Sequence, residues 1–364
     1  MKTVPINGEI NSFKQRSYWL LGGGLVLLAL VGIALAYQGR SQDYRQQVEN
    51  RLRLVGEVQN KNVVAWRRKR MADAGALTED PLLAHALTDW LHSRRQDPEL
   101  EQMLLQRLQV LVEFEEYALV RLLDTEGRVL LGTDTITAND LPHQEMQALT
   151  QALAQGSPVA VEPQALGYFA FPFFSVMAPL YDGVKSIGVV WLVIDLRTSL
   201  YSLLQAWQLE SPSAEVVLVQ RHGDKNIINI NPLPKSGVLP LSKALPLTRT
   251  ESPGIQAMRG ARGVVRGLNH KDRPIVAMVS AIDGAPWWLT LQIDEAEVVG
   301  DARRREGLAF GLLVGGVLFS TALLGGIWQW TAWRTERALK RELELNICID
   351  PVKTCTGPKL EERT

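Results

Sequence analysis

Two long apolar runs lie near the two ends of the chain, and almost everything else lies between them. The first extends from Tyr18 to Tyr37, and the second, from Leu308 to Trp333, carries no charged residue. About 20 apolar residues in a helix suffice to cross a bilayer, so both runs are expected to be transmembrane helices. Two spans would place both termini on one side of the membrane and the intervening domain on the other.

The first run also allows a second interpretation. The segment Ala34-Leu35-Ala36 resembles a signal-peptidase site, so the run could be a cleaved signal peptide. Its apolar stretch is longer than most signal-peptide cores, and Tyr18, Trp19 and Tyr37 lie where interfacial aromatic residues are expected. An uncleaved anchor is therefore favoured. Basic residues flank both runs on both sides and do not orient the protein by themselves.

The second run begins with glycines at a spacing of four residues. Gly307, Gly311 and Gly315 form a double GxxxG pattern on one helix face. Small residues in this arrangement let two membrane helices approach closely. The pattern predicts a helix-dimer face, although glycine is also common in membrane helices for other reasons.

Between the runs, the apolar pattern first has a helical period. Residues 43–78 contain no proline and place apolar residues three or four positions apart, which predicts one long amphipathic helix. Its basic segment, residues 67–70, is expected to be a solvated helix face. Asp80-Pro81 and Asp97-Pro98 then read as helix starts, with Asp as the N-cap and Pro at the first helical position. They predict helices over residues 81–94 and 98–115.

From Tyr117 onward the pattern is mainly that of strands. Two groups of strands are predicted, separated by a break at Ser211-Pro212-Ser213. The first group has a helix at residues 141–155, a helical stretch at 196–207, and strands at 117–124, 128–132, 159–162, 169–180 and 187–195. The second group has a proline-rich, largely irregular loop at residues 232–253 and strands at 215–220, 226–230, 263–268, 274–282 and 287–293.

The two groups repeat one scheme. Each opens with strand, turn and strand, and each closes with a hairpin that ends in Ile-Asp, at Ile194-Asp195 and at Ile293-Asp294. This duplication predicts an α+β fold of two antiparallel-sheet modules, each with helices on one face, preceded by the long helix and framed by the two spans. Asp294 with Glu297 reads as a capping box, which predicts a helix from Glu295 that continues through the second run to Leu345.

Composition narrows the function. Lys and Arg total 39 and Asp and Glu total 39, so there is no charge excess of the kind that binds nucleic acid. The two cysteines, Cys348 and Cys355, lie in the last 20 residues, which excludes a disulfide scaffold for the main domain. Common hydrolase, calcium-binding and redox motifs are missing, and His85 with His92 has no third metal ligand in view. We therefore expect no enzymatic activity, no cofactor and no metal.

At four segments the chain resembles a double Cache domain, the PAS-like extracytoplasmic input module of bacterial transmembrane receptors. The similarity covers residues 43–300, and the segments that carry it are Leu123-Asp-Thr-Glu-Gly-Arg-Val-Leu130, residues 178–195, residues 214–223 and residues 286–298. The resemblance implies small-molecule sensing in the periplasm by a homodimer in the bacterial inner membrane. In such receptors the second span leads to a histidine kinase, a diguanylate cyclase or a chemotaxis signalling region.

The resemblance also suggests where a ligand would bind, between the sheet of the first module and its covering segments. The predicted contacts lie on the opening strand, on the long strand and at the end of the closing strand: Tyr117, Arg121, Tyr168, Phe171, Phe173 and Asp195. Aromatic side chains would form apolar walls, and Arg121 or Asp195 would fix a ligand's charge. The alternative is that the aromatics are core and that Asp195 caps the following helix. The Tyr-x-Arg-x-Trp signature of amino-acid-binding members is not visible, so no ligand class follows.

The resulting layout is a cytoplasmic N-terminus (1–17), a first span (18–37), a periplasmic sensor domain (38–306), a second span (307–333) and a short cytoplasmic tail (334–364). Within the sensor domain, the membrane-distal module covers residues 80–207 and the membrane-proximal module residues 213–294. The tail starts as a charged helix and departs from the family at Ile347, so it is expected to be a truncated or frameshifted remnant of a receptor, or a short tail in its own right. The favoured function is ligand sensing with transmission through the second span. The alternatives are a non-signalling decoy partner of full-length receptors and, least favoured, an anchored periplasmic hydrolase.

Overall fold

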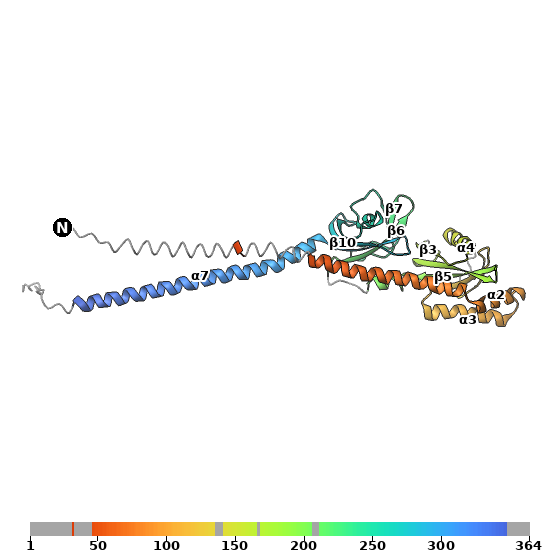
Figure 1. The fold of residues 1–364 in the computed structure, drawn as a ribbon, viewed down its shortest axis with the longest axis horizontal. Helices are drawn as coiled ribbons and strands as arrows, with labels where there is room; N and C mark the ends of the chain where they lie inside the picture. Colours follow the sequence, from red (N-terminus) through yellow and green to blue (C-terminus); the bar gives the residue numbers. More distant parts are fainter. Residues whose placement is uncertain (1–30, 33–45, 135–140, 166–167, 206–210, 348–364) are drawn as a thin grey trace, which may run out of the picture. The chain divides into compact units, whose positions relative to one another are not determined.

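A long amphipathic helix is the first large element of the structure. The computed structural model describes residues 31–32, 46–134, 141–165, 168–205 and 211–347, without the side chains of 205, 299–310, 313, 339 and 342–347. The long helix, residues 46–78, packs Leu52 and Val55 against strands of the second sheet. Farther along, Val63, Ala74 and Leu77 belong to the core of the first sheet. One helix therefore supports both modules (orange in Figure 1), and the predicted helix is confirmed over its described part.

Two capped helices follow the long helix. Asp80 is the N-cap of α2 (Pro81–His92), and Asp97 is the N-cap of α3 (Pro98–Glu115). In both, the carboxylate accepts hydrogen bonds from two backbone N–H groups of the first turn, which are otherwise unsatisfied at a helix start. The Asp-Pro pattern thus predicted both helix starts to the residue.

The first sheet has five antiparallel strands in the order β2-β1-β5-β4-β3. Its elements are β1 (Leu119–Leu123), β2 (Val129–Gly132), α4 (His143–Gln155), β3 (Val159–Gln164), β4 (Phe173–Asp182), β5 (Lys185–Asp195) and α5 (Leu200–Gln205). Alternate residues of β5 face opposite sides, so Val190 and Leu192 contact the core under the long helix, α2 and α3, whereas Trp191 and Val193 contact the core under α4.

The second sheet has six antiparallel strands in the order β8-β7-β6-β11-β10-β9. Its elements are β6 (Glu215–His222), β7 (Asn226–Asn229), β8 (Ala244–Pro246), α6 (Pro253–Met258), β9 (Gly263–Leu268), β10 (Pro274–Ala281) and β11 (Trp287–Asp294). The long helix packs on one face of this sheet and α6 on the other. The predicted loop 232–253 therefore contains one short strand, β8, and leads directly into a short helix.

The two sheets share one topology. Without β8, the second order becomes β7-β6-β11-β10-β9, which matches β2-β1-β5-β4-β3 strand for strand. In each sheet the closing strand lies between the opening strand and the long hairpin partner. The α+β class with a long N-terminal helix and two antiparallel sheets is thereby confirmed.

Arg67 of the long helix joins the two modules. Its guanidinium forms an ion pair with Glu162 of β3 (Nη2 to Oε1, 2.9 Å), and its Nε donates to the carbonyl of Gly284 at 3.1 Å. Trp287 of β11 donates its indole N–H to the same carboxylate, and the Arg67 guanidinium lies 4.8 Å from the centre of the Trp287 ring. Phe174 and Trp66 complete this aromatic junction.

The prediction of a solvated basic face was wrong for two of its four residues. Arg67 and Arg70 are buried, while Arg68 and Lys69 are exposed. The physical reason is that both modules pack on this side of the helix and supply carboxylate and carbonyl partners for the two guanidinium groups.

The last strand leads straight into a helix. β11 ends at Asp294 and α7 (Glu295–Ile347, blue in Figure 1) begins at the next residue. The unbroken helix predicted from Glu295 is present, but the capping box is different. Glu297 accepts hydrogen bonds from the backbone N–H (3.0 Å) and hydroxyl of Ser213, and that hydroxyl in turn accepts from the N–H of Asp294 (3.0 Å).

The two predicted membrane spans are not confirmed by the structure. Within the described residues, no helix combines the length and the apolarity that crossing a bilayer requires. Apart from residues 31–32, the first apolar run lies outside the described residues, as do 348–364 with both cysteines.

The Arg67 junction leads to a stability prediction. Replacing Arg67 with Met should lower the free energy of unfolding by about 2–3 kcal/mol, because Glu162 loses its cationic partner in a partly buried place. Chemical denaturation of the full chain followed by tryptophan fluorescence measures this. Arg68→Met is the matched control, since Arg68 is exposed, and it should stay within about 0.5 kcal/mol of the parent. Equal effects of the two substitutions would contradict the account.

Candidate ligand-binding site

A buried arginine lies at the middle of the first sheet, on the face that α4 covers. Arg121 of β1 is fully buried and forms a two-point ion pair with Asp134, Nε to Oδ1 at 3.0 Å and Nη2 to Oδ2 at 2.7 Å. Its Nη1 donates to the hydroxyl of Tyr168 at 3.0 Å. In the strand register it lies between Trp191 of β5 and Gly132 of β2. A Cβ on Gly132 would come 3.2 Å from Cγ of Arg121, so glycine makes room for this side chain.

Aromatic rings surround the guanidinium. The centre of the Trp191 ring lies 5.6 Å from Cζ of Arg121. The centres of the Tyr168 and Trp191 rings are 5.9 Å apart. Phe169 contacts all of the other rings, edge-on to Tyr168 and to Phe173 at 4.9 Å each and stacked on Phe171 at 5.3 Å. This arrangement gives an apolar wall with one fixed positive group, which suits a ligand that carries an anionic end.

Two of the predicted aromatics are placed differently than expected. Tyr168 and Phe171 precede the long strand, because β4 begins at Phe173. Pro172, which has no backbone N–H to donate, directly precedes the first residue of β4. Their rings nonetheless reach the same cluster as Phe173.

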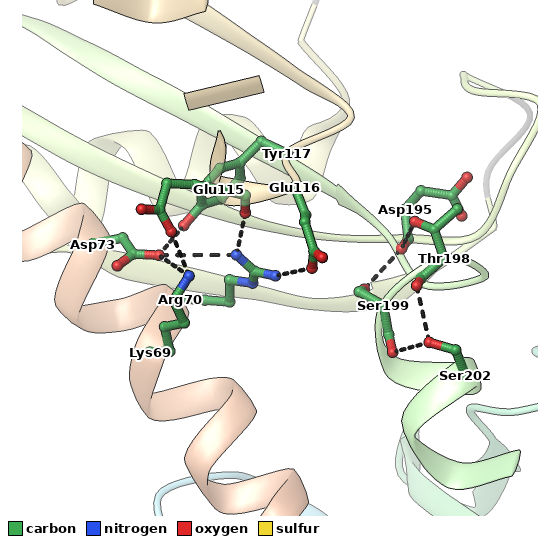
Figure 2. A network of polar contacts seen from close by, with 10 residues as sticks. All are labelled: Lys69, Arg70, Asp73, Glu115, Glu116, Tyr117, Asp195, Thr198, Ser199 and Ser202. Atoms are coloured by element: carbon green, nitrogen blue, oxygen red, sulfur yellow. Dashed lines mark hydrogen bonds and ion pairs between the residues drawn. The ribbon is translucent and has the colours of Figure 1, made fainter. Parts of the chain in front are cut away.

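Asp195 lies at the end of this face and has a local partner. It is paired with Phe173 in the strand register, and it accepts hydrogen bonds from the backbone N–H (2.8 Å) and the guanidinium of Arg197 (Nη2 to Oδ2, 2.7 Å). Its backbone carbonyl accepts from the hydroxyls of Thr198 and Ser199 (Figure 2). Its carboxylate therefore accepts hydrogen bonds within the turn of residues 195–199, which precedes α5 and differs from the predicted cap of the helix itself.

Tyr117 belongs to the other face of the sheet. Its hydroxyl donates to Asp73 of the long helix at 2.9 Å, and its ring lies 5.0 Å from the Arg70 guanidinium (Figure 2). Burial and the neighbouring Asp73 carboxylate raise the pKa of this phenol above its ordinary value. The same network pairs Lys69 with Glu115. Five of the six predicted contacts thus lie on one face, and Tyr117 does not join them.

Sequence reasoning missed four side chains of this face: Asp134, Glu145, Phe169 and Trp191. The alternation of β5 could have identified Trp191, and the Tyr168–Phe173 run could have identified Phe169. Nothing local indicated Glu145, which lies on α4 and is fully buried, with its carboxylate accepting a hydrogen bond from Gln164 of β3. Only the packing of α4 on the sheet brings Glu145 to this place.

The ionisation of the face follows from its burial. Burial alone would lower the pKa of Arg121, but Asp134 and Tyr168 more than offset this, so its pKa lies above the ordinary value and the group stays charged. Burial raises the pKa of Glu145 from 4.5 to about 7, although the Gln164 hydrogen bond opposes the shift. Within the described residues, no group of three or more His, Cys, Asp or Glu side chains is arranged to hold a metal ion.

Comparison with known proteins gives matches among solved structures alone. No protein-family model and no curated protein matches the chain. The ligand-binding domain of the Pseudomonas fluorescens chemoreceptor CtaA with L-serine is 16% identical, with a TM-score of 0.47 over 69% of this chain and 99% of that one. The ligand-binding domain of Mlp24 with asparagine is 14% identical (TM-score 0.49, 72% and 98%). That of the Pseudomonas aeruginosa PAO1 amino acid chemoreceptor PctB with L-Gln is 18% identical (TM-score 0.46, 72% and 98%).

The conclusion about the fold depends on the strand order itself. Two five-strand arrangements repeat one antiparallel order along a single long helix. The fold therefore consists of two modules with the same strand order, placed along one helix. The Arg121 face belongs to the first module, between its sheet and α4.

The buried Glu145 makes stability depend on pH. Because its folded pKa is raised, the folded state binds the proton more tightly, so this contribution is full below about pH 4.5 and is lost as pH rises to about 7. The loss should be about 2–3 kcal/mol. Glu145→Gln keeps the shape without the charge, and the difference in unfolding free energy between parent and variant should change by that amount between pH 4.5 and pH 7.5. A difference independent of pH would show that Glu145 is ionised throughout.

Proposed function

We propose that this chain is a membrane-anchored extracytoplasmic sensor that binds a small molecule and passes the signal through α7. The observation that carries the proposal is the direct join between the last strand of the sensor domain and a helix of 53 residues. Because no loop separates β11 from α7, a movement of the strand would be passed directly to the start of the helix.

The contacts at this join support transmission. The Ser213 hydroxyl bonds both the last N–H of β11 and the Glu297 carboxylate in the first turn of α7. Ser213 lies just before β6, which pairs with β11 along its length. The start of α7 is therefore held by the two central strands of the second sheet rather than by one.

The Arg121 face is the proposed place for ligand contact in the first module. A fully buried guanidinium is costly to keep in a protein interior unless its partners compensate, and here it has a carboxylate and a phenol besides aromatic rings. An anionic ligand group would share or replace the Asp134 carboxylate, with Tyr168, Phe171 and Phe173 as apolar walls. Asp195, at the end of the same face, would keep the Arg197 guanidinium in place through their ion pair.

Membrane anchoring and dimer formation complete the proposal. The uncharged run Leu308–Trp333 is proposed as the span within α7, with residues 18–37 as the first span and the sensor domain in the periplasm. Gly311 and Gly315 offer one open helix face, since among the described residues a Cβ on either would meet no atom within 4 Å beyond the neighbouring backbone of α7 itself. Such a face suits a second copy of the helix in a homodimer.

A ligand screen tests the sensing function. The full chain in lipid nanodiscs should show a raised melting temperature with at least one compound from a library of small organic acids, amino acids and amines. Tyr168→Phe should then weaken that compound's binding about fivefold, because Arg121 loses one hydrogen-bond partner.

The matched control removes the same atom elsewhere. Tyr181→Phe deletes a hydroxyl that donates to the Leu153 carbonyl, so it should leave the affinity unchanged. A library without any stabilising compound would contradict sensing. A stabilising compound that ignores Tyr168→Phe would contradict the placement on the Arg121 face.

The glycine face has its own test. Gly311→Leu with Gly315→Leu should reduce dimer crosslinking in membranes several-fold, because leucine holds the helices apart. Gly316→Leu is the control, since residue 316 lies about 100° around the helix from residue 315. Equal crosslinking in all three proteins would contradict a dimer through this face.

A further inference from the structure

The second module contains a cavity on the face of its sheet that α6 covers. Its walls come from β6, β7 and β11, from the loop between β7 and α6, and from the hairpin after β9. Its volume, counted as the space open to the centres of water-sized spheres, is about 90 Å³. It is separate from the Arg121 face, which lies on the first sheet.

The repeat explains why the cavity exists here. The closing strands β5 and β11 both end in Ile-Asp. When the strands are aligned at these ends, Thr290 of β11 is the position equivalent to Trp191 of β5. The residue paired with Trp191 in the first sheet is Arg121, and the residue paired with Thr290 in the second is Val217. The two largest side chains on the face of the first sheet are thus replaced by two small ones, at the same place in the same topology. Both of these smaller residues line the cavity.

Two buried polar atoms at the cavity have no protein partner among the described residues. Thr290 is 2% exposed, and its hydroxyl makes no hydrogen bond. The His270 ring bonds the Ser236 carbonyl, while its Nε2 is buried without a partner. Buried polar groups are nearly always satisfied in folded proteins, so two orphan atoms on one cavity indicate an occupant with polar atoms.

The charge and polarity of the walls indicate what that occupant is. Lys243 and Arg249 line the cavity, and no Asp or Glu does. Arg249 already pairs with Asp272, whereas the Lys243 ammonium has no partner among the described residues. The rest of the lining is mainly aliphatic, from Val217, Val219, Ile227, Leu233, Val238 and Leu245. A cation at the edge of an aliphatic hollow selects an anionic group on an apolar chain.

We propose that the second module holds its own ligand site, which takes a small aliphatic carboxylate. The carboxylate lies beside Lys243 and accepts a hydrogen bond from Thr290, and the aliphatic chain lies against β6 and β7. The site is independent of ligand contact in the first module. It lies on β11, the strand that continues into α7.

Isothermal titration of the full chain in nanodiscs with pentanoate tests the proposal. Pentanoate should bind one site per protomer at millimolar concentrations, and the neutral pentanamide and the cationic pentylamine at least tenfold more weakly. Lys243→Gln should weaken pentanoate roughly fivefold to tenfold and leave pentanamide unchanged, since one charge-assisted contact is lost. Lys271→Gln makes the same charge change beside His270 but outside the lining, and should have no effect.

Thr290→Val separates binding from packing. It should weaken pentanoate about fivefold, the loss expected for one hydrogen bond, and raise the melting temperature of the unliganded chain because an unsatisfied hydroxyl is removed. Tyr168→Phe should leave pentanoate affinity unchanged. No pentanoate binding, or equal binding of pentanamide, would overturn the proposal. So would weakening by Tyr168→Phe but not by Thr290→Val, which would place pentanoate in the first module.

Discussion

The two modules share a continuous apolar core along the long helix, and a partly buried ion pair between Arg67 of that helix and Glu162 of the first sheet lies against this core. Glu162 also accepts from the Trp287 indole, and Arg67 also donates to the Gly284 carbonyl, so four groups from three elements meet at one point. The ion pair itself joins the long helix to the first module, and the Gly284 carbonyl and the Trp287 indole add hydrogen bonds from the second module. The junction thus fixes the second module, through the first residue of β11, against the first.

Local signals predicted the elements well because each has a local cause. Asp-Pro pairs gave both helix starts, and two-residue alternation gave most strands to within a few residues. The duplicated Ile-Asp endings predicted a repeat that the strand orders confirm. The predictions that were wrong concern contacts between residues that are distant in sequence. Arg67 and Arg70 read as solvated because their partners, Glu162 and the backbone of Glu115, are distant in sequence. β8 and α6 were missed because a proline-rich stretch carries no period, and only its packing on the sheet orders it.

The candidate site likewise contains residues that the sequence pattern predicts and residues that only long-range packing brings in. Arg121, Tyr168, Phe171, Phe173 and Asp195 share one face because strand parity and a proline break bring them there. Tyr117 precedes β1, and its hydroxyl bonds the long helix instead. Trp191 follows from the alternation of β5, whereas Glu145 joins the face only through the packing of α4, which no motif encodes. The comparison of the two sheets is more informative than either alone, since one topology holds Arg121 and Trp191 in the first module and Val217 and Thr290 in the second.

The central claim of the proposed function is that β11 and the first turn of α7 change together when the chain binds a small molecule. Hydrogen exchange followed by mass spectrometry, on the full chain in nanodiscs with and without a stabilising compound, tests this most directly. The account predicts that binding alters exchange together in β11, in the segment around Ser213 and in the first turns of α7. A change confined to the ligand contacts, with the β11–α7 join unaffected, would contradict it.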